Sequence, residues 1–324
     1  MIPFRYKQAL VTGGAGFIGS HLVDSLVGLG CKVNVLDDLS TGSLSNLARV
    51  KSQISFFEGD IRDRPLLSKV SEGCDILFHQ AAIVSVPQTV EQPVYTAQVN
   101  ELGTLCALEA ARNCGVKRVI IASSCAVYGN DPRVPKHETM EPCPESPYAV
   151  QKLNGEQHAR LYWKLYGVET ICLRYFNVYG PRQNPGSPYS GVISIFLNRA
   201  AAAKPPEIHG NGTQSRDFIF VADVVKANLL AAAAQGVSGV NINVGTGKPV
   251  TINALWKLIS HIFKIHVKPR HTEARAGDVF ASAAGTDFAA SALGFKPEHS
   301  LEKGLRITFK WHKKVLAKNG YPRR

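Results

Sequence analysis

The sequence contains no apolar run long enough for a membrane-spanning helix. Such a helix needs about 18 consecutive apolar residues, whereas polar residues interrupt the apolar 45% of these 324 residues throughout. The first residues, MIPFRYKQALVTGG, enter a predicted strand almost at once and leave no room for a signal peptide. We therefore expect a cytoplasmic globular protein that does not bind membranes, with enough chain to bury a large core.

Paired cysteines are also missing. The seven cysteines are odd in number and scattered, and no two of them are spaced as C-x-x-C. This pattern argues against a disulfide framework and against a zinc site, and it is typical of a reducing compartment. We therefore expect no metal ion.

Acidic residues are scarce relative to basic ones. The 25 Asp and Glu residues against 37 Lys and Arg residues give a formal net charge of +12. A basic surface attracts anions such as nucleic acids, acidic lipids or phosphorylated small molecules. The densest basic stretch, KWHKKVLAKNGYPRR at residues 310–324, is typical of a solvated helix end. Because no recognition motif accompanies the charge, we expect no nucleic-acid partner.

A glycine-rich turn follows the first predicted strand and precedes a helix, in QALVTGGAGFIGSHLVDSLVGLG. Gly14, Gly16 and Gly19 satisfy G-x-G-x-x-G, and Gly13 with the last two gives G-x-x-G-x-x-G. Glycines permit a tight turn and bring the backbone close to a pyrophosphate, whose charge the helix N-terminus favours. The pattern predicts a dinucleotide site, the alternative being an ordinary strand–helix–strand unit with glycine turns.

The second predicted strand, KVNVLDD, supports the dinucleotide interpretation. It brings Asp37 to a strand end eighteen residues beyond Gly19. A carboxylate there can accept hydrogen bonds from an adenosine ribose and repels a 2′-phosphate, which favours NAD over NADP.

Further predicted strands alternate with helices along the chain. They end at Asp60, Ala82, Ser124 and Gly180. The alternation predicts an α/β fold with a Rossmann-type, doubly wound parallel sheet, whose ligands bind at the carboxyl ends of the strands. We expect an NAD-binding Rossmann domain at 1–180, with 217–247 returning to it, and a smaller interleaved α/β substrate domain at 181–216 and 248–324.

The segment SPYAVQKLNGE, residues 146–156, predicts the start of a helix with proline in its first turn. Tyr148 and Lys152 are four residues apart and therefore lie on one helix face. Ser123 and Ser124 end a predicted strand some two dozen residues earlier. A hydroxyl, a phenol and an amine beside a nicotinamide form a set suited to moving a proton and a hydride. An exposed pair on the helix surface is the alternative for Tyr148 and Lys152.

The chain resembles the extended short-chain dehydrogenases/reductases and, within them, the nucleotide-sugar 4-epimerases. The resemblance runs nearly end to end, on TGGAGFIGSH, DDLSTG, EGDIRD, HQAA, SSCAVYG, the Tyr148–Lys152 pair, RYFNVYGPRQ, GNGTQSRDFIFVADVV, NVGTG and RAGDV. It implies that Tyr148 removes the proton of the sugar 4-hydroxyl while a hydride moves from carbon 4 to tightly bound NAD. Ser124 would steady the developing carbonyl, and the hydride would return to the other face of the 4-keto sugar. Because a free tyrosine has a pKa of about 10, we expect Lys152 and the nicotinamide charge to lower it.

The resemblance also implies which residues hold the two ligands. Besides Tyr148 and Lys152, the NAD residues would be Gly13, Gly16, Phe17, Ile18, Asp37, Asp38, Ser40, Thr41, Gly42, Asp60, Ile61, Gln80, Ala81, Ala82 and Tyr175. Besides Tyr148 and Ser124, the UDP-sugar residues would be Ser85, Ser123, Asn177, Gln183, Val192, His209, Arg216, Arg275, Asp278 and Ser282. Arg216 and Arg275 would take the diphosphate, since guanidinium groups fork onto phosphate oxygens, with Asp278 on the ribose.

One position bears on the identity of the sugar. In the family that the chain resembles, the fourth residue after the Asp278 position borders the sugar pocket. A bulky aromatic side chain there restricts the site to glucose and galactose, whereas a small one leaves room for an N-acetyl group. Because Ser282 occupies this position, we expect interconversion of UDP-N-acetylglucosamine and UDP-N-acetylgalactosamine, with UDP-glucose and UDP-galactose as further substrates.

Other functions stay open at this point. In a UDP-uronic-acid 4-epimerase, Arg182 or His209 would meet the substrate carboxylate. In a non-enzymatic alternative, the chain binds NAD and uses its basic surface to hold RNA or a protein. Elimination chemistry is not expected, because Cys125 and Ala126 stand where related dehydratases carry an acidic pair. The resemblance further implies a homodimer, formed by the helices at 101–113 and 148–166.

Overall fold

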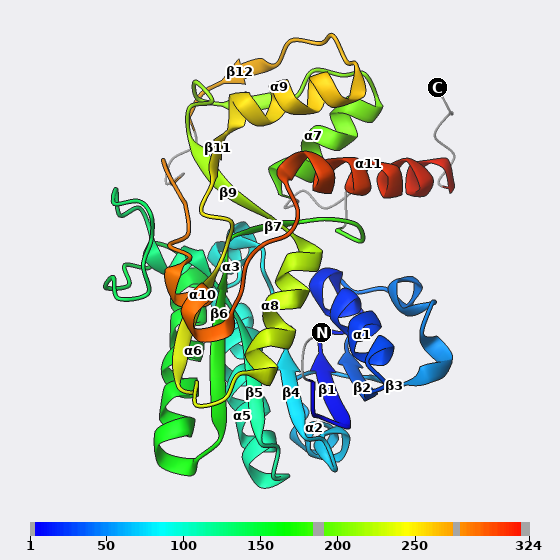
Figure 1. Ribbon diagram of the computed structural model, residues 1–324, viewed down its shortest axis with the longest axis vertical. Helices are drawn as coiled ribbons and strands as arrows, with labels where there is room; N and C mark the ends of the chain where they lie inside the picture. The colour runs from blue at the N-terminus through cyan, green and yellow to red at the C-terminus, as the bar shows by residue number, and fades with distance from the viewer. Residues whose placement is uncertain (1–3, 184–190, 275–278, 319–324) are drawn as a thin grey trace.

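The larger part of the structure is a seven-stranded sheet in the order β10-β6-β5-β4-β1-β2-β3 (Figure 1). The computed structural model describes residues 4–183, 191–274 and 279–318. All neighbouring strands of this sheet are parallel. The strands are β1 (Gln8–Thr12), β2 (Lys32–Asp37), β3 (Ile54–Glu58), β4 (Ile76–His79), β5 (Arg118–Ser124), β6 (Glu169–Tyr175) and β10 (Val240–Val244). The predicted doubly wound parallel sheet is confirmed.

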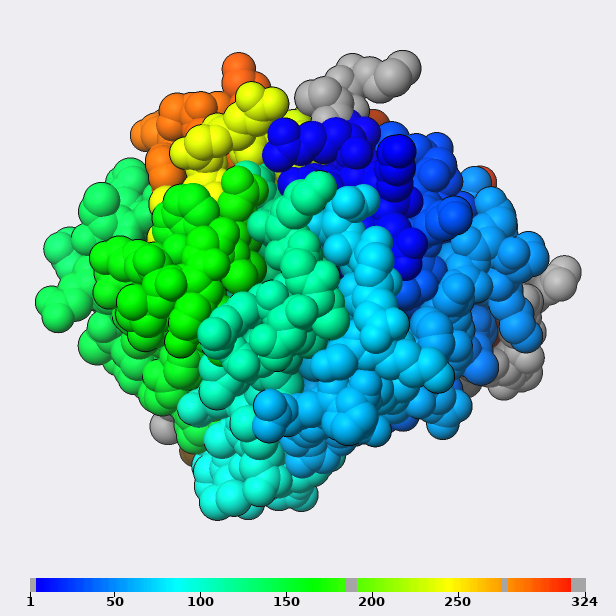
Figure 2. Space-filling view, turned by 90° about the horizontal axis from the view of Figure 1, so that it is seen from below, coloured from blue at the N-terminus to red at the C-terminus, as the bar shows by residue number. Residues whose placement is uncertain are grey.

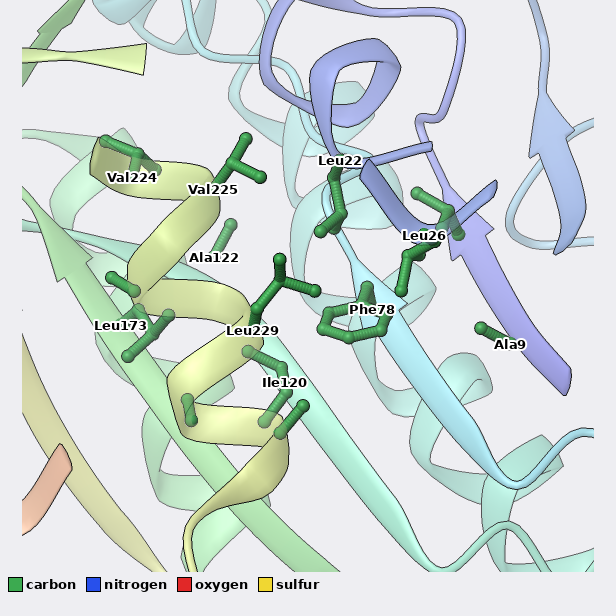
Figure 3. Packing of buried hydrophobic residues seen from close by; sticks show 14 of the residues in the cluster. Ala9, Leu22, Leu26, Phe78, Ile120, Ala122, Leu173, Val224, Val225 and Leu229 are labelled. Carbon is green, nitrogen blue, oxygen red and sulfur yellow. The ribbon is translucent and has the colours of Figure 1, made fainter. Parts of the chain in front are cut away.

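Helices cover both faces of this sheet, as its near-continuous apolar strands require. The covering helices are α1 (Phe17–Gly28) and α8 (Val221–Ala233) on one face, and α2 (Arg64–Ser71), α5 (Gly103–Asn113) and α6 (Pro147–Tyr166) on the other. Figure 3 shows the first face, where Leu22 and Leu26 of α1 and Val224, Val225 and Leu229 of α8 pack over Phe78, Ile120 and Leu173. This packing fixes the carboxyl ends of the central strands relative to the helices that follow them.

A smaller lobe lies beyond the carboxyl ends of the large sheet (Figure 1). It contains a three-stranded sheet, β11-β9-β7, and a two-stranded one, β12-β8. The strands are β7 (Asn177–Tyr179), β8 (Glu207–His209), β9 (Ser215–Phe220), β11 (Pro249–Thr251) and β12 (Arg270–Thr272), and the helices are α7 (Val192–Ala201), α9 (Ile252–Phe263) and α11 (Leu301–Lys318). Phe196, Trp256 and Phe309 lie in the core of this lobe.

The chain passes between the two lobes several times. It leaves the large sheet after Tyr175, returns with α8, leaves again after β10, returns with α10 (Asp287–Leu293) and leaves once more with α11. Packing of α10 on α8 and β10 places this short helix against the large sheet, although the expected domain division assigned 248–324 to the substrate domain. The division into two domains with those boundaries stays a prediction.

The structure departs from the sequence-based elements in two places. The single strand expected to run to Gly180 is split at Phe176, because β6 belongs to the large sheet and β7 to the small one. Two short helices, α3 (Val86–Glu91) and α4 (Pro93–Ala97), and a π-helical turn at Gln98–Leu102 precede α5.

Within the described residues, no helix is both long and apolar enough to cross a membrane.

Candidate active site

A cavity of about 650 Å³ lies at the carboxyl ends of the large-sheet strands, between the two lobes. The turn after β1 lines one end of it, and the ends of β4 and β5 together with α6 line the other. Residues that follow β7 contribute the wall from the small lobe. This is the crevice in which doubly wound folds bind their ligands.

The glycine turn lets the backbone form the floor of the cavity. Gly13 has a φ of +67°, and a Cβ atom there would lie 2.6 Å from the backbone nitrogen of Ala81. A Cβ atom on Gly19 would lie 2.1 Å from the carbonyl oxygen of Gly13, so neither position accepts a side chain. Gly16, which caps α1, lines the cavity with them, whereas Gly14 does not. The spacing that forms the cradle is therefore Gly13-x-x-Gly16-x-x-Gly19.

Asp37 connects the end of β2 to this turn. Its carboxylate accepts hydrogen bonds from the backbone nitrogens of Ala15 at 2.8 Å and Leu39 at 2.9 Å. Burial raises the pKa of this carboxyl group, and the two backbone donors oppose that shift. A carboxylate has about four lone-pair sites, so Asp37 keeps acceptor capacity for ribose hydroxyls beside the cavity.

The helix that carries Tyr148 and Lys152 begins where the sequence predicts it. Pro147 is its first residue, and the Ser146 side chain accepts a hydrogen bond from the backbone nitrogen of Ala149. The Nζ atom of Lys152 lies 6.0 Å from the centroid of the Tyr148 ring and donates to the carbonyl oxygen of Ala122 at 2.8 Å. The predicted placement of phenol and ammonium on one helix face, beside the end of β5, is confirmed.

Burial is the main cause of the pKa shifts of this pair. Burial raises the pKa of Tyr148 to about 12, although contact with the Ser124 hydroxyl acts in the opposite sense. Burial also lowers the pKa of Lys152 to about 8. Desolvation of the phenolate therefore sets the direction for the side chains alone. The expectation that Lys152 and the nicotinamide charge together lower the pKa of Tyr148 stays a prediction.

Ser123 and Ser124 have different partners. The Ser124 hydroxyl accepts a hydrogen bond from the backbone nitrogen of Ala126 at 3.2 Å, which leaves its proton available on the cavity side. The Ser123 hydroxyl instead donates to the carboxylate of Glu156 at 2.5 Å. Only Ser124 can therefore donate a hydrogen bond toward Tyr148 or a bound sugar without losing a buried partner.

Most of the predicted ligand residues line this one cavity. They are Gly13, Gly16, Phe17, Ile18, Asp37, Asp38, Ser40, Thr41, Ile61, Gln80, Ala81, Ala82, Ser85, Ser123, Ser124, Tyr148, Lys152, Tyr175 and Gln183. Seven predicted residues are not among its lining: Gly42, Asp60, Asn177, Val192, His209, Arg216 and Ser282. Arg275 and Asp278 lie outside the described residues.

The residues away from the cavity wall have partners of their own. Asp60 pairs with Arg62 at 2.5 Å, and this ion pair lowers the pKa of Asp60. His209 contacts the Thr272 hydroxyl at 2.9 Å. Ser282 is 7% exposed and lies in hydrogen-bonding contact with Cys125, the neighbour of Ser124. Ser282 therefore lies one residue behind the cavity wall at its β5 end.

Sequence reasoning missed several lining residues. They include Asn46, Ile83, Val84, Gln88, Tyr95, Val99 and Phe176. Arg182 also lines the cavity, but its guanidinium group pairs with Asp24 at 2.6 Å. No spacing rule could single out Val84 or Tyr95, because α3 and α4 are placed by their packing against each other and against α6, which is distant in the sequence.

Among the described residues, no group of three or more His, Cys, Asp or Glu side chains is arranged to hold a metal ion. His79, at the end of β4, is buried between the hydroxyls of Thr12 and Thr104, at 2.8 and 3.0 Å. Burial lowers its pKa to about 3, so this histidine stays neutral at physiological pH.

Comparison with known proteins agrees with this geometry. A family model described as the NAD dependent epimerase/dehydratase family matches residues 9–245. The chain belongs to this family. The predicted resemblance is confirmed, and NAD is the cofactor.

Individual relatives match almost the whole chain. A putative UDP-glucose 4-epimerase from Methanocaldococcus jannaschii is 40% identical, over 94% of this chain and 98% of its own length. The crystal structure of a Thermotoga maritima UDP-glucose 4-epimerase with UDP-glucose is 39% identical, with a TM-score of 0.91 over 95% of this chain and 99% of that one. A UDP-N-acetylglucosamine 4-epimerase from Methanobrevibacter ruminantium M1, in complex with UDP-N-acetylmuramic acid, is 38% identical, with the same TM-score and coverage.

The residues of the cavity fit NAD. The backbone cradle at Gly13 and Gly19 has no room for side chains and leaves the N-terminus of α1 open to a pyrophosphate. Asp37 offers a carboxylate to the ribose and would repel a 2′-phosphate. Tyr148 and Lys152 line the same cavity as this cradle.

Proposed function

We propose that the chain is an NAD-dependent UDP-hexose 4-epimerase that interconverts UDP-N-acetylglucosamine and UDP-N-acetylgalactosamine. One observation carries the proposal. Tyr148, Lys152 and Ser124 line the same cavity as the glycine cradle, so a base, a cation and a hydroxyl share a site with the cofactor. The names of the three relatives described above, each a 4-epimerase of a UDP-sugar, support the reaction type.

Tyr148 is the proposed acid and base. Its phenolate oxygen takes the proton of the sugar 4-hydroxyl in the oxidation step. The resulting phenol returns the proton to the 4-oxygen in the reduction step. Bound NAD supplies the acceptor for the hydride of carbon 4 and the source of its return to the opposite face. Lys152 stabilises the phenolate by its charge, and Ser124 donates a hydrogen bond to the 4-oxygen as a carbonyl develops there.

Ser282 supports the N-acetyl sugars as substrates. The side chain is small and buried, and it contacts Cys125, directly beyond the serine that would hold the 4-oxygen. A tyrosine at this position would fill space toward the cavity, and close-packed interiors do not accommodate such an overlap. Relatives with similar identity act on UDP-glucose or on UDP-N-acetylglucosamine, so overall similarity does not distinguish the two substrates.

The test compares four substrates with three forms of the protein. Wild type, Ser282→Tyr and Ser282→Ala are each incubated with UDP-glucose, UDP-galactose and their two N-acetyl counterparts, and the products are resolved by chromatography. We expect wild type to convert the N-acetyl sugars, and Ser282→Tyr to lower kcat/KM for them at least tenfold while keeping activity on the plain hexoses. Ser282→Ala, which keeps the space open, should behave as wild type. A wild-type protein active only on the plain hexoses would contradict the substrate assignment.

The expected homodimer is proposed on the surface that α5 and α6 form. The two helices pack against each other, and Figure 2 shows the teal and green segments that contain them next to each other on one face of the molecule. Large apolar side chains are exposed around them, with Leu102 at 46%, Leu161 at 44% and Leu165 at 65%. A second copy of the chain would bury these side chains across a two-fold axis.

The remaining ligand contacts are proposals as well. Arg216 lies on β9, where its guanidinium group donates to the carbonyl oxygen of Ser215. We propose that Arg216 takes the diphosphate together with Arg275, and that Asp278 takes the uridine ribose. Of the side chains suggested for a uronic-acid carboxylate, Arg182 pairs with Asp24 through Nη2 while its Nη1 is buried without a hydrogen-bond partner among the described residues, and His209 contacts Thr272.

A further inference from the structure

A buried polar cluster lies directly behind the β5 end of the cavity. Its members come from five separate segments of the chain: Ser123, Tyr128, Glu156, Arg174 and Asn243. Arg174 donates to the Tyr128 hydroxyl at 2.9 Å, and Tyr128 donates in turn to the side-chain oxygen of Asn243 at 2.8 Å. The proposed mechanism uses none of these groups, although Ser123 lines the cavity.

The direction of the hydrogen bond between Ser123 and Glu156 follows from the contacts of the carboxylate. Arg174 binds both of its carboxylate oxygens, Nε to Oε1 at 2.8 Å and Nη2 to Oε2 at 2.6 Å. The two side chains are 1% and 2% exposed. Arg174 contributes only donors, so both carboxylate oxygens of Glu156 act as hydrogen-bond acceptors in this geometry. The bond between Glu156 and Ser123 therefore has one possible direction, with the Ser123 hydroxyl as donor.

We propose that Glu156 is a positioning residue that makes Ser123 a hydrogen-bond acceptor toward the sugar nucleotide. A serine hydroxyl has one proton and two lone pairs. The proton is committed to Glu156 at 2.5 Å, so the lone pairs are what Ser123 presents to the cavity. Its partner on the substrate is a donor, either a sugar hydroxyl or the N–H of the acetamido group.

With this assignment the two adjacent serines have different hydrogen-bonding roles toward the sugar. Ser124 has accepted a bond from the backbone nitrogen of Ala126 and can donate to the reacting oxygen. Ser123 has donated its proton and can accept from a neighbouring group of the sugar. Ser124 would thus contact the 4-oxygen, which loses its proton during the reaction. Ser123 would contact a neighbouring hydroxyl or N–H group of the sugar, which keeps its proton. The inference rests on the proposed function, because it needs a sugar in this end of the cavity.

The test removes one donor at a time from the substrate. UDP-N-acetylglucosamine is compared with its 3-fluoro and 6-fluoro analogues and with an analogue that carries acetoxy in place of acetamido at carbon 2, each of which lacks one donor. We expect one analogue to raise KM in wild type by about three- to tenfold, the usual worth of one hydrogen bond. In Ser123→Ala the KM for the parent sugar should rise by a similar factor, and that analogue should bring no further penalty.

Two variants separate the direction of the bond from a loss of packing. In the double variant Glu156→Leu with Arg174→Met the Ser123 hydroxyl loses the acceptor of its proton and can donate it to the substrate, so the analogue penalty should disappear or reverse. The control is Tyr128→Phe, which cuts the Arg174–Tyr128–Asn243 connection but leaves Glu156 against Ser123, and it should keep the analogue penalty of wild type. If this double variant does not fold, as judged by thermal unfolding, the Ser123→Ala comparison decides alone.

The outcomes are distinguishable from failure of the proposed function. A wild-type protein that converts none of the UDP-sugars overturns the proposed function. A protein that converts the parent sugar, but shows the same KM ratio for every analogue in wild type and in Ser123→Ala, overturns only the assignment of Ser123 and Glu156.

Discussion

Replacing Lys152 by methionine tests the electrostatic part of the mechanism. The change removes a positive charge 6.0 Å from the centroid of the Tyr148 ring and keeps most of the side-chain volume. With an effective dielectric constant of about 20, two unit charges at this separation interact by about 3 kcal/mol, which corresponds to about 2 pH units. Because burial leaves Lys152 with a pKa of about 8, the ammonium is mostly charged at pH 7 and the full effect applies there.

The sign of the expected shift follows from the role of the phenolate. Tyr148 works as a base only when it is deprotonated, so activity rises with pH through its pKa. Without the ammonium that pKa is higher, and the rising limb of the pH–activity profile should move up by about 2 units. At pH 7 we therefore expect kcat to fall about 100-fold, with partial recovery toward pH 9.

The assay is a pH series of initial rates with the preferred UDP-sugar, normalised to the NAD released from each preparation on denaturation. This normalisation distinguishes a change in the pKa of Tyr148 from a loss of bound NAD. Lys69→Met, at an exposed lysine on α2, is the matched control and should leave the profile unchanged. If the Lys152→Met profile overlies that of wild type, the ammonium does not set the basicity of Tyr148 and the electrostatic reasoning fails.

Two further predictions concern the cofactor cradle and the assembly. Gly13→Ala forces a side chain within 2.6 Å of the Ala81 backbone in a left-handed conformation, so the purified protein should contain little NAD. The control Gly28→Ala, where an added Cβ meets nothing within 4 Å, should retain NAD. Equal NAD contents in the two variants would contradict the role of Gly13 in the cofactor cradle. Leu165→Glu places a charge on a side chain that is 65% exposed on α6, so light scattering after size-exclusion chromatography should show a monomer, and an unchanged dimer would move the interface elsewhere.

Local rules were enough to predict the parts of the site that one or two elements build. The glycine turn, Asp37 at the end of β2, and Tyr148 with Lys152 on α6 all lie where the spacing in the sequence puts them. In each case the reason is geometric, because the end of a parallel strand and the pitch of a helix determine where the next side chains lie.

Features that depend on long-range packing could not be predicted in this way. The raised pKa of Tyr148 comes from burial by the whole site, which the Tyr148–Lys152 spacing does not reveal. The different roles of Ser123 and Ser124 depend on Glu156, which reaches β5 from another element. Arg182 pairs with Asp24, far away in the sequence, so its charge is already partnered.

The repeated passage of the chain between the lobes limits how the cavity can open. Two lobes joined by one linker can open by a hinge motion, but here several separate connections between the lobes would have to bend together. We therefore expect entry and exit of the sugar nucleotide to rely on small movements at the rim of the cavity. Such an architecture suits a catalyst that regenerates its own oxidant in every cycle and has no need to exchange it.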